Sequence, residues 1–229
     1  MPMDAAQLEA LLPPLDDAPG PELRGGGSAD GLRYTGLELV GDATDARFLE
    51  CVLDGCDLAG VLLDRARFAT SMLTDVRATA VSMPDATLLD VVVAGGRFGA
   101  LTAHGAKLTR VWLQDLKVDF VNLRGATLVD VTLSGCTIGE LDVSGGDLRD
   151  VRLVDTTVES LVLTGARHRS VDLRGADIGR VDGVVDLRGC TISSTQLADW
   201  AAGMAAHSRF SSAWTTRAAA STSRKSAAA

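Results

Sequence analysis

The feature that most constrains this chain is a large aliphatic side chain at every fifth position. Over residues 123–143 this position holds Leu123, Leu128, Leu133, Ile138 and Val143. A second small or apolar residue stands two places before each of the last four: Ala126, Val131, Cys136 and Leu141. A period of five matches neither the 3.6 residues of a helical turn nor the alternation of a strand. The backbone must therefore return to the same environment every five residues.

The frame of five runs without interruption from Ala46 to Asp182, loses one residue near Gly183 and then resumes. Its inward residues sort into four columns spaced twenty apart. One column reads Ala46, Ala66, Ala86, Ala106, Ala126, Gly146 and Ala166. Residues twenty apart share an environment, which predicts a coil with four sides of five residues, stacked as a solenoid. About seven coils between residues 46 and 185 would form a stack of about 34 Å.

A glycine column supports the same geometry at one corner of the coil. It consists of Gly105, Gly125, Gly145 and Gly165. Glycine fits a tight corner where φ is positive or where a Cβ atom would meet the next coil. The inward residues Leu123, Leu128, Leu133, Ile138, Ala126 and Val131, with Gly125 and Gly145, are therefore predicted to be structural.

The repeat resembles that of the pentapeptide-repeat family, whose unit is Ala-(Asp/Asn)-Leu-x-x. Matching units include "ADIGR" (176–180), "CDLAG" (56–60) and "ATLVD" (126–130), and the resemblance covers residues 46 to about 197. It implies an all-β fold, a right-handed four-sided β-helix. The position before the central residue departs from the family pattern, since it is often Thr, Arg or Lys. The unbroken frame of five excludes a left-handed β-helix with six-residue sides.

Four segments are expected from these patterns. Residues 1–31 form a short helix, stopped by Pro13 and Pro14, and a Pro/Gly/acidic linker. Residues 32–192 form the β-helix, and residues 193–208 form a C-terminal helix that caps the last coil or mediates a homodimer. Residues 209–229 are a basic Ser/Ala-rich tail, predicted to be disordered. Both terminal helices are expected to be short caps, because open coil edges promote aggregation.

The composition narrows the class of function. The net charge of −8 divides into −7 over residues 1–45, −5 over residues 46–199 and +4 over residues 200–229. This balance disfavours direct nucleic-acid binding by the solenoid body. No apolar run approaches the ~18–20 residues of a membrane span, and no signal sequence opens the chain, so we expect a cytoplasmic protein.

Motifs of catalysis and of cofactor or metal binding are missing from the sequence. "GALTAHGAK" (99–107) is not a P-loop, and no Gly-x-Ser-x-Gly elbow occurs. Cys51, Cys56 and Cys136 fall at inward positions and are expected to be free, apolar core thiols. His168 also falls at an inward position and is expected to be a core residue rather than a ligand or a pH switch. We therefore predict no enzyme activity, no cofactor and no metal.

One column of outward positions is apolar and forms a candidate interaction site. It contains Val52, Met72, Val92 and Trp112, with Leu49 and Leu89 near the same corner. Contiguous exposed apolar surface often marks a partner or dimer site. Two alternatives stay open: the N-terminal segment folds back over this column, or the inward and outward assignment is locally wrong.

A second outward column is acidic and contains Glu50, Asp90, Asp130 and Asp150. Some pentapeptide-repeat proteins mimic duplex DNA, occupy the DNA-binding saddle of type II topoisomerases and alter quinolone sensitivity. DNA of 34 Å length carries about 20 phosphate charges, against a net −5 here. The leading hypothesis is therefore a non-enzymatic scaffold that binds a protein partner of unknown identity. The alternative is a DNA-mimicking modulator of DNA gyrase.

Overall fold

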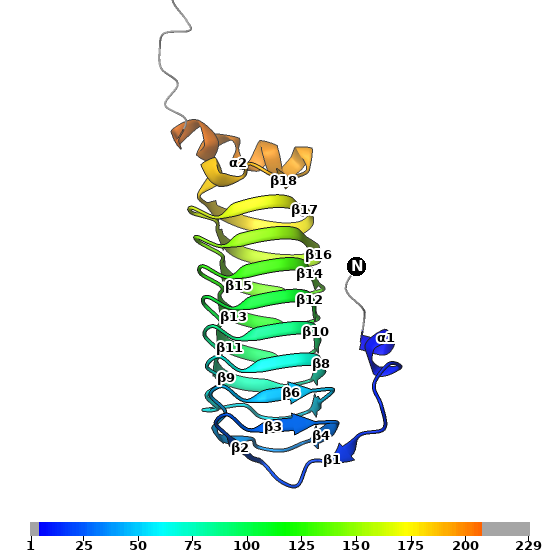
Figure 1. Ribbon diagram of the computed structural model, residues 1–229. Helices are drawn as coiled ribbons and strands as arrows, with labels where there is room; N and C mark the ends of the chain where they lie inside the picture. Colours follow the sequence, from blue (N-terminus) through cyan, green and yellow to red (C-terminus); the bar gives the residue numbers. More distant parts are fainter. Residues whose placement is uncertain (1–4, 208–229) are drawn as a thin grey trace, which may run out of the picture.

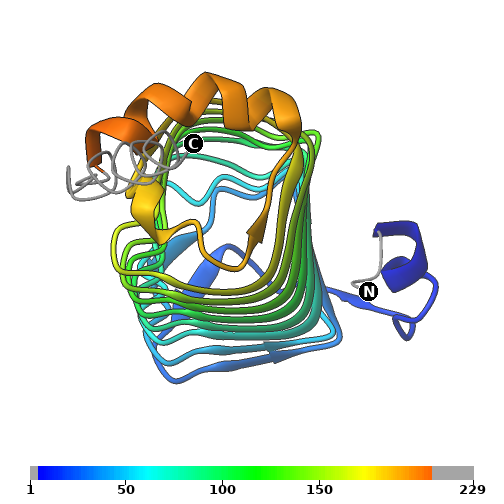
Figure 2. The same cartoon turned by 90° about the horizontal axis from the view of Figure 1, so that it is seen from above.

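A computed structural model describes residues 5–207 as a parallel β-solenoid of about nine turns (Figure 1). Seen from above, the turns lie over one another with a four-sided outline (Figure 2). The all-β solenoid predicted from the repeat is confirmed, although the number of turns exceeds the predicted seven.

Strands follow one another along the coils. The first turns contain β1 (Asp16–Asp17), β2 (Glu22–Arg24), β3 (Ser28–Asp30), β4 (Leu32–Thr35), β5 (Val40–Asp42), β6 (Arg47–Leu49) and β7 (Val52–Asp54). The middle turns contain β8 (Arg67–Thr74), β9 (Arg77–Ser82), β10 (Thr87–Ala94), β11 (Arg97–Thr102), β12 (Lys107–Gln114), β13 (Lys117–Asn122), β14 (Thr127–Ser134) and β15 (Thr137–Asp142). The last turns contain β16 (Asp147–Val162), β17 (Arg167–Asp182), the 3-10 turn η1 (Val184–Asp186) and β18 (Cys190–Thr191). The helices are α1 (Ala5–Glu9) and α2 (Ser194–His207).

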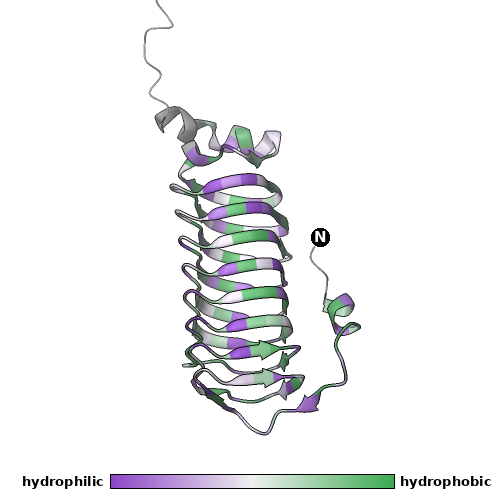
Figure 3. Ribbon diagram, in the orientation of Figure 1, coloured by the Kyte–Doolittle hydropathy of each residue, from purple (hydrophilic) through white to green (hydrophobic). Residues whose placement is uncertain are grey.

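Pairing between turns has the register that the sequence predicts. In the middle turns, each paired residue lies in parallel register with the residue twenty positions later. Leu108 pairs with Leu128, and Leu128 pairs with Leu148. The lost residue near Gly183 appears as a register of nineteen, since Val171 pairs with Cys190. Stacked bands of apolar and polar residues therefore recur from turn to turn (Figure 3).

The inward columns form one continuous apolar core along the solenoid. All six residues predicted to be inward and structural are buried: Leu123, Leu128, Leu133, Ile138, Ala126 and Val131. Near the N-terminal end the rings of Phe48 and Phe68 stack with centroids 4.5 Å apart. Gly125 and Gly145 adopt φ of 64° and 66°, which confirms the predicted left-handed corner.

The solenoid begins earlier than predicted, within the segment taken for a linker. Asp16 pairs with Leu32, Glu22 with Val40 and Ser28 with Arg47, so pairing between turns starts at residue 16 rather than at residue 32. These pairings are spaced by sixteen, eighteen and nineteen residues instead of twenty. The frame of five is therefore broken in the first turn, and the repeat does not reveal it.

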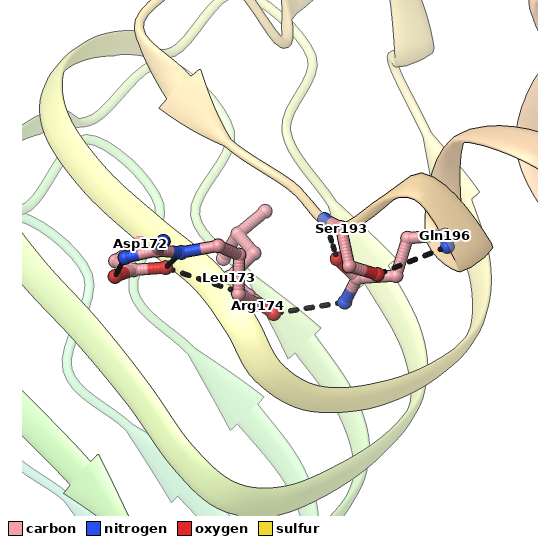
Figure 4. Close-up of polar contacts among 5 residues, drawn as sticks. All are labelled: Asp172, Leu173, Arg174, Ser193 and Gln196. Carbon is pink, nitrogen blue, oxygen red and sulfur yellow. Dashed lines mark hydrogen bonds and ion pairs between the residues drawn. The ribbon is translucent and has the colours of Figure 1, made fainter.

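The C-terminal helix caps the last turn, as predicted (Figures 1 and 2). The backbone N–H of Gln196 donates to Ser193 Oγ at 3.1 Å, and that of Ser193 donates to Gln196 Oε1 at 2.8 Å, forming a capping box. Gln196 Nε2 donates to the carbonyl of Leu173 at 2.8 Å (Figure 4). It also donates to the carbonyl of Ala176 at 2.9 Å, so the cap satisfies acceptors of the turn beneath it. Trp200 is buried against the core. Residues 208–229, including the predicted tail, lie outside the described residues.

The N-terminal helix does not cap an end, and this corrects the prediction. α1 lies beside the solenoid and packs against β8 and β10 (Figures 1 and 2). The first turn is left with an open cavity of about 210 Å³ at the N-terminal end, whose lining includes Leu23, Tyr34 and Phe48. Neither described helix is long and apolar enough to cross a membrane.

Candidate functional site

The candidate site is the apolar column on the side of the solenoid, formed by Val52, Met72, Val92 and Trp112. The four residues lie on β7, β8, β10 and β12 and are adjacent in register: Val52 with Met72, Met72 with Val92, and Val92 with Trp112. Their neighbours along the strands, such as Leu53 and Leu73, belong to the inner core. Parallel turns are ~4.8 Å apart, so the column forms a strip of about 14 Å along the solenoid.

α1 covers the lower part of this column. Leu8 is fully buried, and Val52, Met72 and Val92 are buried against it as a cluster separate from the inner core. Ala5, Leu12, Leu15, Ala94 and Trp112 are partly buried around the cluster. The predicted exposure of Val52, Met72 and Val92 is therefore wrong for this conformation. The alternative, in which the N-terminal segment folds back over the column, is what the structure shows.

Trp112 marks the end of the covered region. It is only partly buried, yet its indole Nε1 is inaccessible and has no hydrogen-bond partner among residues 5–207. Beyond it the column continues with polar residues, Thr132 and Arg152. The other two predicted residues, Leu49 and Leu89, are exposed, and Ala69 separates them in the register. They do not join the buried cluster.

An arginine follows the apolar column at the end opposite to Trp112. Arg33 of β4 pairs in register with Val52 and so occupies the next position below the apolar strip. Its guanidinium lies 3.8 Å from Glu9 Oε1 of α1. Both side chains are substantially exposed, so this ion pair contributes little to holding α1 in place.

The acidic residues occupy a corner of the coil. Glu50, Asp90, Asp130 and Asp150 have φ between 53° and 55°, a left-handed conformation that aspartate tolerates better than most residues. The same corner column also contains Thr70, Arg110 and Ser170. Arg110 donates from Nε and Nη2 to the two carboxylate oxygens of Asp90 at 2.5 and 2.7 Å. The predicted ladder is therefore a column interrupted by neutral and basic residues, not a continuous line of negative charge.

The thiols and the inward histidine have environments that suppress their reactivity. Burial raises the pKa of the thiols of Cys51, Cys56 and Cys136, and it raises the pKa of Cys190 to about 11. All four cysteines are free and stay protonated at neutral pH.

Both nitrogens of His168 are buried without a hydrogen-bond partner in the described part of the chain. Within residues 5–207, no group of three or more His, Cys, Asp or Glu side chains could hold a metal ion.

The repeat and the fold agree with each other. A frame of five, four sides and a twenty-residue register between parallel turns are now established for residues 46–182. In its repeat and its fold, the chain resembles pentapeptide-repeat proteins. No protein-family model and no curated protein sequence matches it.

Solved structures that match this chain include forms of QnrB1 and HetL. A trypsin-treated form of QnrB1, a plasmid-mediated fluoroquinolone resistance protein, is 18% identical, with 74% of this chain and 94% of that chain covered and a TM-score of 0.39. HetL, a pentapeptide-repeat protein involved in regulating heterocyst differentiation in the cyanobacterium Nostoc sp., is 17% identical, with 84% and 98% covered and a TM-score of 0.27. At these values the similarity concerns the fold type alone.

Proposed function

We propose that this protein is a non-enzymatic scaffold of the pentapeptide-repeat type that binds a protein partner through the side face around Trp112. The observation that carries the proposal is the packing of α1, because this face already binds a helix of its own chain. Outward positions farther up the same column hold Thr132 and Arg152, so apolar residues are not required there by the fold. Their presence in four consecutive turns needs another explanation, and binding provides one.

Trp112 is the natural centre of the partner site. Large aromatic residues at the edge of an apolar cluster contribute strongly to protein interfaces. The indole Nε1 is covered and lacks an acceptor within residues 5–207, which leaves its hydrogen-bonding capacity unused. A partner that displaces the groups covering this nitrogen would be able to supply a backbone carbonyl or a carboxylate as the acceptor.

A DNA-mimicking modulator of DNA gyrase is less well supported by the surface. DNA mimicry requires negative charge at the density of phosphates, about one per 1.7 Å. Here Thr70, Arg110 and Ser170 interrupt the acidic corner, and Arg110 pairs with Asp90 through two hydrogen bonds. Further cross-turn ion pairs, Arg65 with Asp45 and Arg167 with Asp147, also neutralise carboxylates.

A site-specific photo-crosslinker tests the proposal. The full chain, with a benzophenone amino acid in place of Trp112, is expected to form a discrete adduct with one protein in the cells that produce it. The matched control carries the same amino acid at Thr102, ten residues earlier and so half a coil away, and is expected to form none. Equal adducts at both positions, or none at either, would contradict the proposal.

A further inference from the structure

From the packing of α1 we infer that the apolar column is a helix-docking site whose present occupant is exchangeable. The partner segment that replaces α1 is an amphipathic helix with large apolar anchors and an acidic residue at one end. This inference rests on the proposed function, since it specifies the chemistry of the protein partner for that face.

The spacing of the column suits a helix that lies along the solenoid. Successive turns are ~4.8 Å apart, and an α-helix advances ~5.4 Å per turn. Apolar residues at i, i+3 or i+4, and i+7 recur once per helical turn, so each can contact one turn of the solenoid. The strip from Val52 to Trp112 covers about 14 Å, which corresponds to roughly ten residues of helix.

α1 uses only part of this strip. It contains five residues, Ala5–Glu9, and packs against the two strands β8 and β10. Leu8 is its single fully buried residue, and both Ala5 and Trp112 are only partly buried beside the cluster. A helix of two or more further turns, with a large side chain near Trp112, would complete the burial of the column.

α1 is too short to be stable in isolation, so its docking depends on a few contacts. These are made by Leu8 and, farther along the same segment, by Leu12 and Leu15. The chain after it reaches Pro13 and Pro14, which cannot continue the helix. Leu11 is 65% exposed and adds no contact to the cluster. The salt bridge between Glu9 and Arg33 is long and solvent-accessible, so it adds little.

The two ends of the strip define the polarity of the partner. Arg33, below Val52, already attracts the carboxylate of Glu9. A partner helix therefore carries an acidic residue at the Arg33 end. At the other end it places a large apolar side chain over Trp112 and a hydrogen-bond acceptor near the indole nitrogen.

The test uses the full chain and a labelled synthetic peptide of residues 3–15 in which Ala5 is replaced by leucine. Leu8→Glu places a charge at the fully buried anchor of α1 and is expected to release residues 5–15, the N-terminal arm, without unfolding the solenoid. Leu11→Glu introduces the same charge at an exposed position of the same arm. Fluorescence anisotropy is expected to show about tenfold tighter peptide binding to Leu8→Glu than to the parent, since the docked arm no longer competes. Leu11→Glu is expected to bind as the parent does.

A second change locates the binding. Val92→Glu added to Leu8→Glu is expected to abolish peptide binding, while circular dichroism verifies that the solenoid stays folded. Equal affinity for parent, Leu8→Glu and Leu11→Glu, or binding that survives Val92→Glu, would overturn the inference. Light scattering that shows a dimer for the parent and a monomer for Leu8→Glu would also overturn it, because the arm would then dock on a second copy.

The outcomes separate the two proposals. A crosslinked partner at position 112 with no peptide binding to Leu8→Glu would reject the exchangeable helix and keep the scaffold. Peptide binding without any crosslinked partner would keep the docking site and reject the scaffold function.

Discussion

Replacement of His168 by leucine measures how much a buried polar side chain lowers the free energy of unfolding of this solenoid. His168 pairs in register with Leu148 and continues the inward column of Leu108, Leu128 and Leu148. Its two nitrogens are buried without a hydrogen bond of good geometry among the described residues, although the backbone of Asp186 lies near the ring. An unsatisfied buried polar group costs about 1–3 kcal/mol, so His168→Leu is expected to raise the free energy of unfolding by about this amount.

The stabilisation expected from His168→Leu is larger at acidic pH than at neutral pH. Burial lowers the pKa of His168, and Asp186 offsets only part of that effect. As the pH falls below about 6.5, the unfolded chain binds a proton at this residue before the folded chain does. The folded state therefore loses stability as the pH is lowered through the folded-state pKa of His168. His168→Leu removes this loss, so its advantage over the parent grows at acidic pH.

Thermal unfolding at about pH 8 and about pH 5.5 provides the assay. A gain of 1 kcal/mol shifts the midpoint by roughly 2–4 °C for a chain of this size. The control is His104→Gln, because His104 is an exposed outward residue and its replacement should leave both midpoints unchanged. The reasoning is refuted if His168→Leu unfolds at or below the temperature of the parent at both pH values.

Three further predictions concern the corner, the cap and the acidic column. Gly96→Ala should lower the free energy of unfolding by about 1–3 kcal/mol, since φ is 106° and a Cβ would meet the backbone carbonyl of Val76. Gly125→Ala, with a φ of 64° and open space around the Cβ position, should cost less in the same denaturant titration. Gln196→Ala should leave two buried carbonyls unpaired and cost about 1–3 kcal/mol, seen as faster hydrogen exchange in α2 and β17 with β10 unchanged. In a gyrase supercoiling assay, micromolar protein should not inhibit; inhibition that disappears when the acidic column is neutralised would instead favour DNA mimicry. That variant carries Gln or Asn at Glu50, Asp90, Asp130 and Asp150.

The dimer predicted through residues 193–208 stays a prediction. Leu197 of α2 is exposed, and Trp200 of the same helix is buried in the cap. An apolar residue on the outer side of a cap could contact a second copy. Light scattering of the parent and of Leu197→Glu would detect a dimer that depends on this surface.

The sequence alone determined the repeating part of the fold, because a solenoid repeats its environment at a fixed interval along the chain. Leu123, Leu128 and Leu133 are separated by one side each, and their burial follows from that local period. The same logic placed Gly125 at a corner and detected the residue lost near Gly183. The logic failed over residues 16–45, where spacings of sixteen, eighteen and nineteen remove the period although the chain still forms a turn.

Only the tertiary structure decided what lies on the outer surface. The sequence identified Val52, Met72, Val92 and Trp112 as an outward apolar column, but no period relates that column to Leu8. The burial of the column depends on the path of residues 10–15. This segment places α1 along the side of the solenoid rather than over its end. Likewise, the twenty-residue spacing places Arg110 next to Asp90, but only the structure shows that the two side chains form a bidentate ion pair. Such contacts join segments far apart in the chain, and their free energy depends on a packed geometry that local spacing does not encode.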